Sequence, residues 1–443
     1  MRCMKSDKEY DVIVCGAGPA GFCAALAAAR LGAKTVLIEK YGMPGGTLTV
    51  LGSNSIDMFV NPYRGDNRMI ITGIPWEFVK KLHGKGEAFV PDMDAPFVCN
   101  QQYGVKVRPV AASALMDDML LEAGVRLCYC QGAADVETET DADKVRVSAV
   151  VVSTKEGLKR IPAGYVIDAT GDGDICAWAG NRYECGGEDG SLQPGTLRYY
   201  LSGAASPAEI ADANILFRQE RESGNLTEDD LLYGADFETI LKYNGENRNH
   251  VMGLNSADSD SRTAAEIRAR KRLCVLNDVI KRTGAPVYIA GTAPESAARE
   301  SRRIMGDCRM TADDWMSCRR AADAVCYTYW HIDIHGPGDY MSKHIYLKGP
   351  ETPSVPLGCM IPESLSNVLV AGRCISGDRA SVSAVRVKAS CMAMGQAAGT
   401  AAAIAADRNE RFIRRVDLNA VKNALANSGA VVPGLTEPEK FVL

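Results

Sequence analysis

The sequence lacks several features that mark whole classes of protein. No apolar run in its 443 residues approaches the roughly 20 residues that a membrane-spanning helix needs, so no membrane span is expected. Basic residues are not in excess: 50 Lys and Arg stand against 55 Asp and Glu, and the net charge of −5 argues against a nucleic-acid partner. The opening stretch, MRCMKSDKEYDVIV, lacks the apolar segment and cleavage site of a secretory signal. We therefore expect a cytoplasmic protein.

Cysteine is plentiful, but the spacing of a zinc site or a disulfide framework is missing. The count of 15 is odd, and several cysteines, such as Cys15 and Cys326, lie among apolar residues. Cysteines in such surroundings usually act as small buried hydrophobic residues in a reducing compartment. One residue separates Cys128 from Cys130, and no second pair follows at zinc-finger spacing. We therefore predict no structural metal.

The stretch YDVIVCGAGPAGFCAALAAAR contains the motif of a dinucleotide-binding turn. Asp11–Cys15 is a short apolar run typical of a buried parallel strand. Gly16, Gly18 and Gly21 follow in the pattern G-x-G-x-x-G, which permits a tight turn, the approach of a pyrophosphate and close packing of helix on strand. The alanine-rich helix expected over residues 20–32 would aim its first amides at the phosphates.

A second strand, expected over residues 34–40, completes this unit. It carries Glu39, an acid 18 residues after Gly21. An acid at this spacing accepts the ribose hydroxyls of an adenosine half, and its charge disfavours a 2′-phosphate. The unit predicts a bound dinucleotide and leaves NAD and FAD both open.

Later segments are expected to return to the same cofactor. Two adjacent glycines, Gly45 and Gly46, free the next loop to pass close to a flat or phosphorylated group, although an ordinary flexible loop is the alternative. Two further apolar strands, Tyr165–Ala169 and Val368–Val370, each end in a glycine-containing turn, and ligands of open parallel sheets bind at such carboxyl ends. The helix ASCMAMGQAAGTAAAIAAD follows, and its first turn can aim free amides at an electron-rich ring edge.

Taken together, these motifs resemble the FAD-dependent oxidoreductase family, which is related to fumarate reductase and succinate dehydrogenase flavoproteins within the glutathione-reductase-like superfamily. The segments that carry the resemblance are GAGPAG…IEKYGMPGGTLT, IDATGDGD, RESRRIMGD, HIDIH and NVLVAGRCIS…VRVKASCMAMGQAAGTAAA, which span nearly the whole chain. The resemblance implies FAD, with the adenosine on the first motif and the flavin near Gly45–Thr47 and Ala393–Ala398. The expected cofactor-binding residues are Gly16, Gly18, Pro19, Ala20, Gly21, Glu39, Lys40, Gly45, Gly46, Thr47, Thr170, Gly171, Asp172, Gly372, Arg373, Gly395, Gln396 and Ala397.

Two departures from the family pattern matter. Fumarate-reductase-type members carry a histidine that bonds covalently to FAD in the loop after the first motif, whereas this loop reads GGTLTVLGSN, so we expect non-covalent FAD. Many closer members read HEA after the CIS motif, and this chain has Arg379 and Ala380 in the first two of those places. The family resemblance therefore assigns no substrate.

The expected fold class is α/β, with a Rossmann-like FAD-binding domain and an inserted, largely helical substrate or cap domain. Residues 1–185 and 343–443 are expected to form the discontinuous FAD-binding domain, in which a β-meander accompanies the parallel sheet and its helices. Residues 186–342 are expected to form the insert. The insert contains a predicted capping box at Ser206 and a long helix that ends at Gly284.

The segment YWHIDIHGPGDY holds the sharpest group of candidate catalytic residues. If it is extended, His331, Asp333 and His335 share one face, which suits a proton relay because histidine titrates near neutral pH. Structural hydrogen bonding and a metal site are the alternatives, and we predict no metal. The family resemblance favours a site beside the flavin, since similar DIH segments lie beside the active site in its members. His83, His250 and His344 lack such context and are expected to be ordinary.

Arginines supply a second set of candidates. If PESAARESRRIMGD is helical, Arg299 and Arg302 or Arg303 share one side, as a solvated face or as an anion site for a substrate carboxylate or the FAD pyrophosphate. Arg379 is the nearest counterpart of a substrate-binding arginine in fumarate-reductase relatives. Arg386 lies in the family's VRV unit, and an internal ion pair is the alternative for both.

The sequence thus predicts a flavoenzyme that moves a hydride between flavin N5 and a small polar or anionic organic substrate, in a direction that stays open. A proton would move through His331, Asp333, His335 or Arg379. The alternative is a flavin-containing electron-transfer or binding subunit that works with a protein partner, and an NAD-only dehydrogenase is a third possibility. A homo-oligomer is compatible with each.

Overall fold

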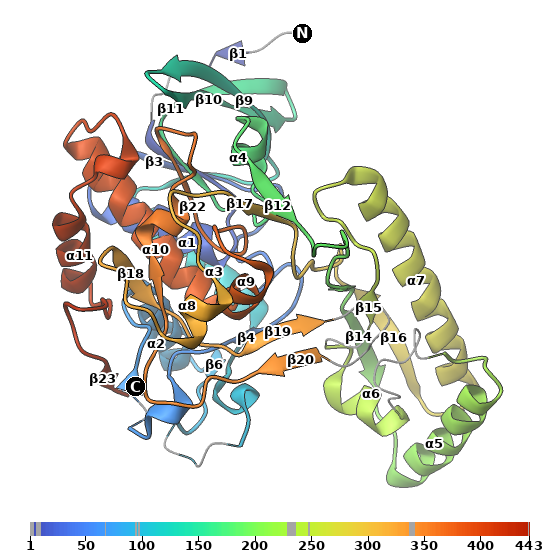
Figure 1. Ribbon diagram of the computed structural model, residues 1–443. Coiled ribbons are helices and arrows are strands. Elements are labelled where there is room, and N and C mark those ends of the chain that lie inside the picture. The colour runs from blue at the N-terminus through green and yellow to red at the C-terminus, as the bar shows by residue number, and fades with distance from the viewer. Residues whose placement is uncertain are drawn as a thin grey trace.

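The computed structural model describes residues 4–5, 10–66, 68–93, 95, 98–227, 236–246, 249–335, 342–441 and 443. Figure 1 shows a larger part, built on a sheet with helices against it, and a smaller lobe to one side that holds α5 (Pro207–Glu222), α6 (Phe237–Tyr243) and α7 (Ser259–Arg282). The mixture of helices and a largely parallel sheet confirms the α/β class.

An eight-stranded sheet organises the larger part. Its order is β8-β3-β2-β11-β10-β9, and both β1 and β22 also pair with β11. The bounds are β1 (Met4–Lys5), β2 (Tyr10–Cys15), β3 (Thr35–Ile38), β8 (Arg126–Cys128), β9 (Gly132–Asp141), β10 (Lys144–Thr154), β11 (Gly157–Asp168) and β22 (Val368–Val370). The predicted strands of the first motif, the meander and the late strand are therefore confirmed.

Strand β11 pairs antiparallel along its first half and parallel along its second half. Its first half runs antiparallel to β10 in the meander, while its second half runs parallel to β2 and β22. The carboxyl ends of β2, β11 and β22 consequently lie side by side, as the register Cys15–Asp168–Val370 shows. Ligands of parallel sheets bind at this edge.

Two helices cross closely over the sheet. They are α1 (Pro19–Arg30) and α10 (Lys388–Asp407), which come from opposite ends of the chain. A Cβ on Gly395 would overlap the carbonyl oxygen of Ala20, and one on Gly399 would overlap that of Ala24. Because glycine has no side chain, the two backbones meet directly, and this contact ties the first motif to the last one.

The lobe has a hydrophobic core of its own. Buried residues between Leu197 and Ala293 form a cluster separate from that of the larger part. Short strands join its helices: β13 (Gly195–Thr196) pairs with β15 (His250–Val251), and β14 (Tyr199–Gly203) pairs with β16 (Val287–Thr292). Ser206 caps α5, with its side chain and that of Glu209 in the predicted capping box.

Residues 302–332 pack elsewhere, since Ile304, Trp315 and Ile332 are buried in the core of the larger part. The segment around Arg302 is a strand, β17 (Arg302–Ile304), paired with β12 (Tyr183–Cys185), so the helical interpretation of PESAARESRRIMGD is wrong. Pairing with β12, which the local sequence does not reveal, decides its conformation.

The other described elements complete the larger part. The helices are α2 (Ile74–Gly84), α3 (Pro109–Glu122), α4 (Asp174–Trp178), α8 (Ala312–Met316), α9 (Arg379–Val385) and α11 (Leu418–Asn427), with single 3-10 turns η1 (Pro62–Arg64), η2 (Asn100–Tyr103), η4 (Leu357–Met360) and η5 (Ile413–Arg415). The strands are β4 (Ser55–Ile56), β5 (Arg68–Met69), β6 (Ala88–Phe89), β7 (Val105–Val107), β18 (Ala324–Tyr327), β19 (Ile332–His335), β20 (Ser342–Ile345), β21 (Ser354–Pro356) and β23 (Glu439–Lys440).

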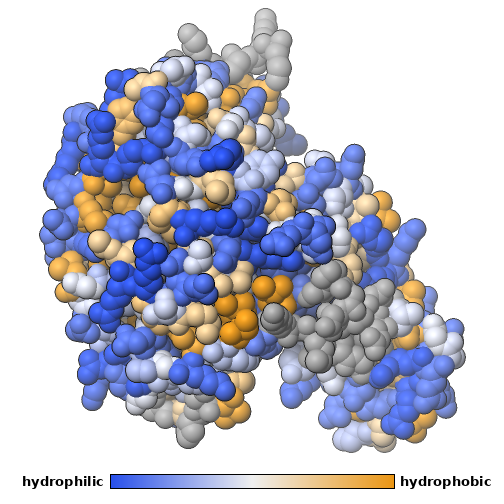
Figure 2. Space-filling view, in the orientation of Figure 1, coloured by the Kyte–Doolittle hydropathy of each residue, from blue (hydrophilic) through white to orange (hydrophobic). Residues whose placement is uncertain are grey.

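The surface agrees with the composition. Figure 2 shows hydrophilic residues over most of one face of both parts, with apolar residues mainly in separate patches among them. Among the described residues, no helix has the length and apolar character that crossing a membrane requires.

Candidate functional site

The glycine-rich turn between β2 and α1 is built as its sequence requires. Gly16 has φ +96°, and a Cβ there would overlap the carbonyl oxygen of Ala169 at the end of β11. A Cβ on Gly21 would overlap the carbonyl oxygen of Gly16, so α1 packs tightly on the turn. At Gly18, by contrast, a Cβ would meet nothing within 4 Å. The turn is thus closed towards the sheet and open at the first amides of α1, where a pyrophosphate would lie.

The following loop returns to this turn, as expected. The amide of Gly45 donates to the carbonyl oxygen of Ala17 over 2.7 Å. Gly46, with φ +47°, comes so near that a Cβ would lie 3.1 Å from the Cα of Gly18. Both glycines therefore serve a close backbone approach rather than flexibility, and they place Thr47 beside the turn.

Glu39 follows β3 at the same edge of the sheet. Its buried carboxylate accepts hydrogen bonds from the amides of Ala17 (2.7 Å) and Tyr41 (2.9 Å). Burial raises the pKa of Glu39, although these two amides oppose the shift. The Nζ of Lys40 lies 3.0 Å from the carboxylate of Glu295, a residue that links the larger part with the lobe.

The turn after β11 is tied to the turn after β22. Asp172 accepts a hydrogen bond from Arg373, 2.6 Å from its Nη2, and Arg373 also donates to the carbonyl oxygen of Gly171. Thr170 bonds back to the fully buried Asp168 over 2.7 Å. The predicted residues Thr170, Gly171, Asp172, Gly372 and Arg373 thus form one connected edge beside the glycine-rich turn.

Helix α10 contributes mainly by packing. Gly395 faces α1, and Ala397 is fully buried. The amide of Gln396 is bonded to the backbone of Ile74 (3.0 Å) and to Ser428 (2.8 Å), so its side chain lies on the side of α2 and α11.

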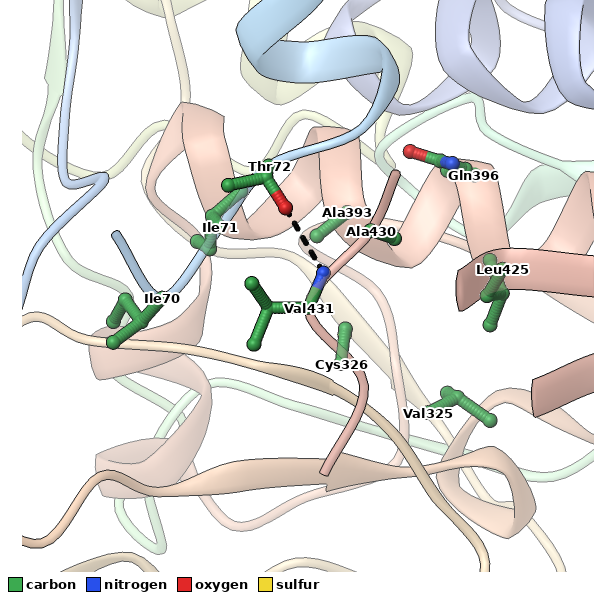
Figure 3. Close-up of a pocket in the computed structure, with 10 residues that line it drawn as sticks. All are labelled: Ile70, Ile71, Thr72, Val325, Cys326, Ala393, Gln396, Leu425, Ala430 and Val431. Carbon is green, nitrogen blue, oxygen red and sulfur yellow. Dashed lines mark hydrogen bonds between the residues drawn. The ribbon is translucent and has the colours of Figure 1, made fainter. Parts of the chain in front are cut away.

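Gln396 also borders a small internal cavity. Figure 3 shows this cavity, of about 10 Å³, between Ile70–Thr72, β18, α10 and the segment Ala430–Val431. Apolar side chains form most of its wall, and its volume suits about one water molecule, so it is a packing void and not a cofactor site.

The candidate catalytic residues do converge. β19 is extended, and Asp333 Oδ1 lies 3.3 Å from His335 Nε2 and 3.9 Å from His331 Nε2. β20 runs antiparallel to β19 and places His344 opposite Asp333, again with 3.3 Å between Nε2 and Oδ1. The rest of the predicted stretch, residues 336–340, lies outside the described residues.

Two more aromatic rings border these imidazoles. His331 stacks between Trp330 and Tyr346, with ring centroids 4.7 and 4.8 Å away. His250 of β15 meets His335 edge-on at 5.3 Å. Four of the five histidines of the chain therefore gather here, including two that sequence reasoning considered ordinary.

Burial controls the charge of this cluster. It lowers the pKa of both His331 and His335 to about 4, although Asp333 acts in the opposite direction. Burial also disfavours the ionised form of Asp333, but His335, His344 and Arg386 outweigh this effect and lower its pKa. At neutral pH the two buried imidazoles are neutral and the carboxylate is charged.

The two predicted arginines make internal contacts. Arg386 donates to the carbonyl oxygen of Asp333 over 3.0 Å and lies 3.4 Å from its Oδ2. Arg379 forms a two-pronged ion pair with the buried Glu300, at 2.7 and 3.0 Å. Both therefore take the internal-pair alternative in this structure.

Two residues, Arg299 and Ser301, connect the cluster with the cofactor edge. Ser301 donates to Asp172 over 2.6 Å, and the carbonyl oxygen of Arg299 accepts from Arg386. The guanidinium of Arg299 lies 3.0 Å from His250 Nε2. The histidine cluster and the turn after β11 are thus neighbours, which their positions in the sequence do not reveal.

Comparison with known proteins decides the family. A family model described as FAD dependent oxidoreductase matches residues 11–425. The chain belongs to this family. FAD is therefore its cofactor.

Relatives of this FAD-dependent oxidoreductase share shorter segments. Dihydrolipoyl dehydrogenase of Trypanosoma brucei brucei is 49% identical over 51 residues, 12% of this chain and 11% of the relative. The 12-dehydrotetracycline 5-monooxygenase/anhydrotetracycline 6-monooxygenase of Streptomyces rimosus is 30% identical over 167 residues, 37% of this chain and 31% of the relative. The chain thus matches less than a third of either curated relative.

A solved structure aligns over a larger share. The geranylgeranyl bacteriochlorophyll reductase-like protein from Thermoplasma acidophilum is 12% identical, covers 95% of this chain and 83% of its own, and gives a TM-score of 0.40.

Proposed function

We propose that this FAD-dependent oxidoreductase moves a hydride between its flavin and a small polar or anionic organic substrate held beside the histidine cluster. When bound, FAD supplies a flavin ring whose N5 accepts or donates the hydride. The observation that carries the proposal is the convergence of His331, Asp333 and His335 next to the turn that holds Asp172.

The protein residues fit the cofactor at three places. The open first turn of α1 at Gly18 would receive the pyrophosphate, and Glu39 at the end of β3 would accept the ribose hydroxyls. Gly45, Gly46 and the Asp172 turn would border the rest of the cofactor. The loop after Glu39 contains no histidine, which supports non-covalent binding.

The cluster would handle the proton that accompanies hydride transfer. A neutral imidazole with a charged carboxylate 3.3 Å away takes up a proton from a substrate hydroxyl or returns it, because the carboxylate stabilises the cation. Arg386 and Ser383 fix Asp333 from the other side. The cationic side chain of Arg299 near His250 favours an anionic substrate group.

Anaerobic flavin spectra recorded with a panel of alcohols, amines, sugars and unsaturated carboxylates would test this function. With the substrate so found, we expect His335→Gln and Asp333→Asn to slow flavin reduction or reoxidation by more than about tenfold, about 1.4 kcal/mol of barrier, without loss of FAD. His83→Gln is the matched control, because His83 lies on α2 and its Nδ1 contacts the nearby carbonyl oxygen of Ala88. Normal rates in both site variants, or reoxidation by a protein partner alone, would contradict the proposal.

A further inference from the structure

The carboxylate of Asp333 has one oxygen with an unusual environment. Oδ2 lies 3.4 Å from the Arg386 guanidinium. Oδ1 is buried, and the Nε2 atoms of His331, His335 and His344 lie 3.3–3.9 Å from it. A buried carboxylate oxygen surrounded by imidazole nitrogens at this spacing suits a ligand set that shares a cation.

Three of these atoms have the spacing of metal ligands. Nitrogen or oxygen atoms of His331, Asp333 and His344 all lie within 4.8 Å of one another. Ligand atoms on one tetrahedral ion, each about 2.1 Å from it, are about 3.4 Å apart, and the 3.3 Å between His344 Nε2 and Asp333 Oδ1 agrees with this value. The His331 nitrogen lies 3.9 Å from Oδ1 and within 4.8 Å of the His344 ligand atom, so its ring would move towards both on binding.

We propose that His331, Asp333 and His344 bind a divalent first-row transition-metal ion. Two imidazoles and one carboxylate form a donor set that suits such ions, and three protein ligands leave positions open for water or for oxygen atoms of a further ligand. The inference concerns binding alone and does not depend on hydride transfer.

The surroundings hold the three ligands in place. Arg386 and Ser383 fix the backbone and the second oxygen of Asp333. Tyr346 Oη lies 3.4 Å from His344 Nδ1, which leaves Nε2 of that ring towards Asp333. Proteins usually orient metal-binding side chains through hydrogen bonds to those of their atoms that do not bind the metal.

Graded burial provides a route for the ion. The side chain of His331 is 2% exposed, that of Asp333 16% and that of His344 37%. An ion therefore enters past His344. The fourth imidazole, His335, lies outside the group of three, and its Nε2 lies 3.3 Å from the same Oδ1 of Asp333.

The test uses the full FAD-loaded chain, expressed without a histidine tag and stripped with a chelator. Calorimetric titration with Zn²⁺ and absorption spectra with Co²⁺ should show about one ion per chain. His344→Gln, a substitution of the most exposed ligand, should weaken binding more than about 100-fold, and Asp333→Asn should do the same. His83→Gln should bind as the unsubstituted chain does.

Each outcome bears on the inference. Absence of stoichiometric binding overturns it, and so does equal affinity in His344→Gln and the unsubstituted chain. Should Asp333→Asn fail to fold, as its melting curve would report, His344→Gln and His331→Gln decide the matter. A chain that binds no metal yet reduces its flavin with substrate overturns this inference and leaves the proposed function standing.

Discussion

Gly16 and Gly18 lie in the same turn and have different surroundings. Gly16 has a left-handed backbone and touches the end of β11, whereas Gly18 has φ −63° and open space on its Cβ side. The first glycine is therefore required by the fold. The fold does not require the second, whose Cβ would meet nothing within 4 Å, so we expect it to serve a ligand that approaches the first turn of α1.

This difference predicts separable effects of two alanines. Gly16→Ala should lower the stability of the FAD-free protein by about 1–3 kcal/mol, because it combines backbone strain with overlap on Ala169. Gly18→Ala should leave that stability unchanged and weaken FAD binding. Urea unfolding of the FAD-free chain and a fluorescence titration with FAD measure the two effects, and equal behaviour of the variants in both would show that the turn does not meet the cofactor.

A buried carboxyl predicts a pH effect. Burial, helped by Asp174, raises the pKa of Asp168 from 3.8 to about 6. Between about pH 4 and pH 6 the native state therefore keeps a proton that the unfolded chain has lost. This bound proton contributes its full share to the free energy of unfolding below pH 4. That contribution, about 3 kcal/mol, is lost as the pH rises through 6. Asp168→Asn should remove this slope in urea unfolding between pH 4 and pH 7.

The control for this measurement is Asp118→Asn, which replaces an exposed acid on α3. It should preserve the slope. An unchanged slope in Asp168→Asn would assign the pH dependence to other groups.

At the scale of elements, the contact between α1 and α10 depends on two glycines. Gly399→Ala should destabilise the protein by about 1–3 kcal/mol, since its Cβ would overlap the carbonyl oxygen of Ala24. Gly84→Ala is the matched control. Gly84 is the last residue of α2, and a Cβ there would meet nothing within 4 Å. The substitution should therefore leave the stability unchanged or raise it slightly. Thermal unfolding of both variants checks the prediction, which fails if Gly399→Ala melts with the unsubstituted chain.

The elements that sequence analysis predicts best are those with local signals. The meander, the strand Val368–Val370 and the capping box at Ser206 depend on alternation, apolar runs and cap chemistry within a few residues. The strand Arg302–Ile304 does not, because its partner β12 is more than 100 residues away. The arginines would share one side of a helix there, but the distant pairing makes the segment a strand.

The same contrast divides the candidate site. The alternation in HIDIH suffices to place His331, Asp333 and His335 on one face. His344 joins them through the pairing of β20 with β19, and His250 arrives from the lobe. Nothing in the residues beside His250 or His344 signals these contacts, so only the assembled fold reveals them.

For the whole molecule, the two hydrophobic cores suggest where the lobe begins and ends. We propose that residues 197–293 form it, a narrower range than the 186–342 expected from sequence, because Ile304 and Trp315 are buried in the other core. Glu295 links the parts, since it pairs with Lys40 on one side and Arg262 of α7 on the other.

Hydrogen exchange tests this division. Amides of α7 and β16 should share one opening free energy that differs from that of β2 and β11. Glu295→Gln should lower the value for the lobe by less than about 1 kcal/mol and leave the sheet unchanged, because Lys40 and Glu295 are partly exposed. If amides in both parts opened with the same free energy, the chain would be a single cooperative unit, and the proposed division would be wrong.

The pairing of β22 with β11 and of α10 with α1 has a consequence for biosynthesis. At about 5–20 residues per second, the ribosome needs tens of seconds to make the chain between α1 and α10. Throughout that interval the alanine-rich surface of α1 is not covered by α10. The nascent protein therefore exposes this surface during translation, and only when the late segments emerge can β22 pair with β11 and α10 pack on α1.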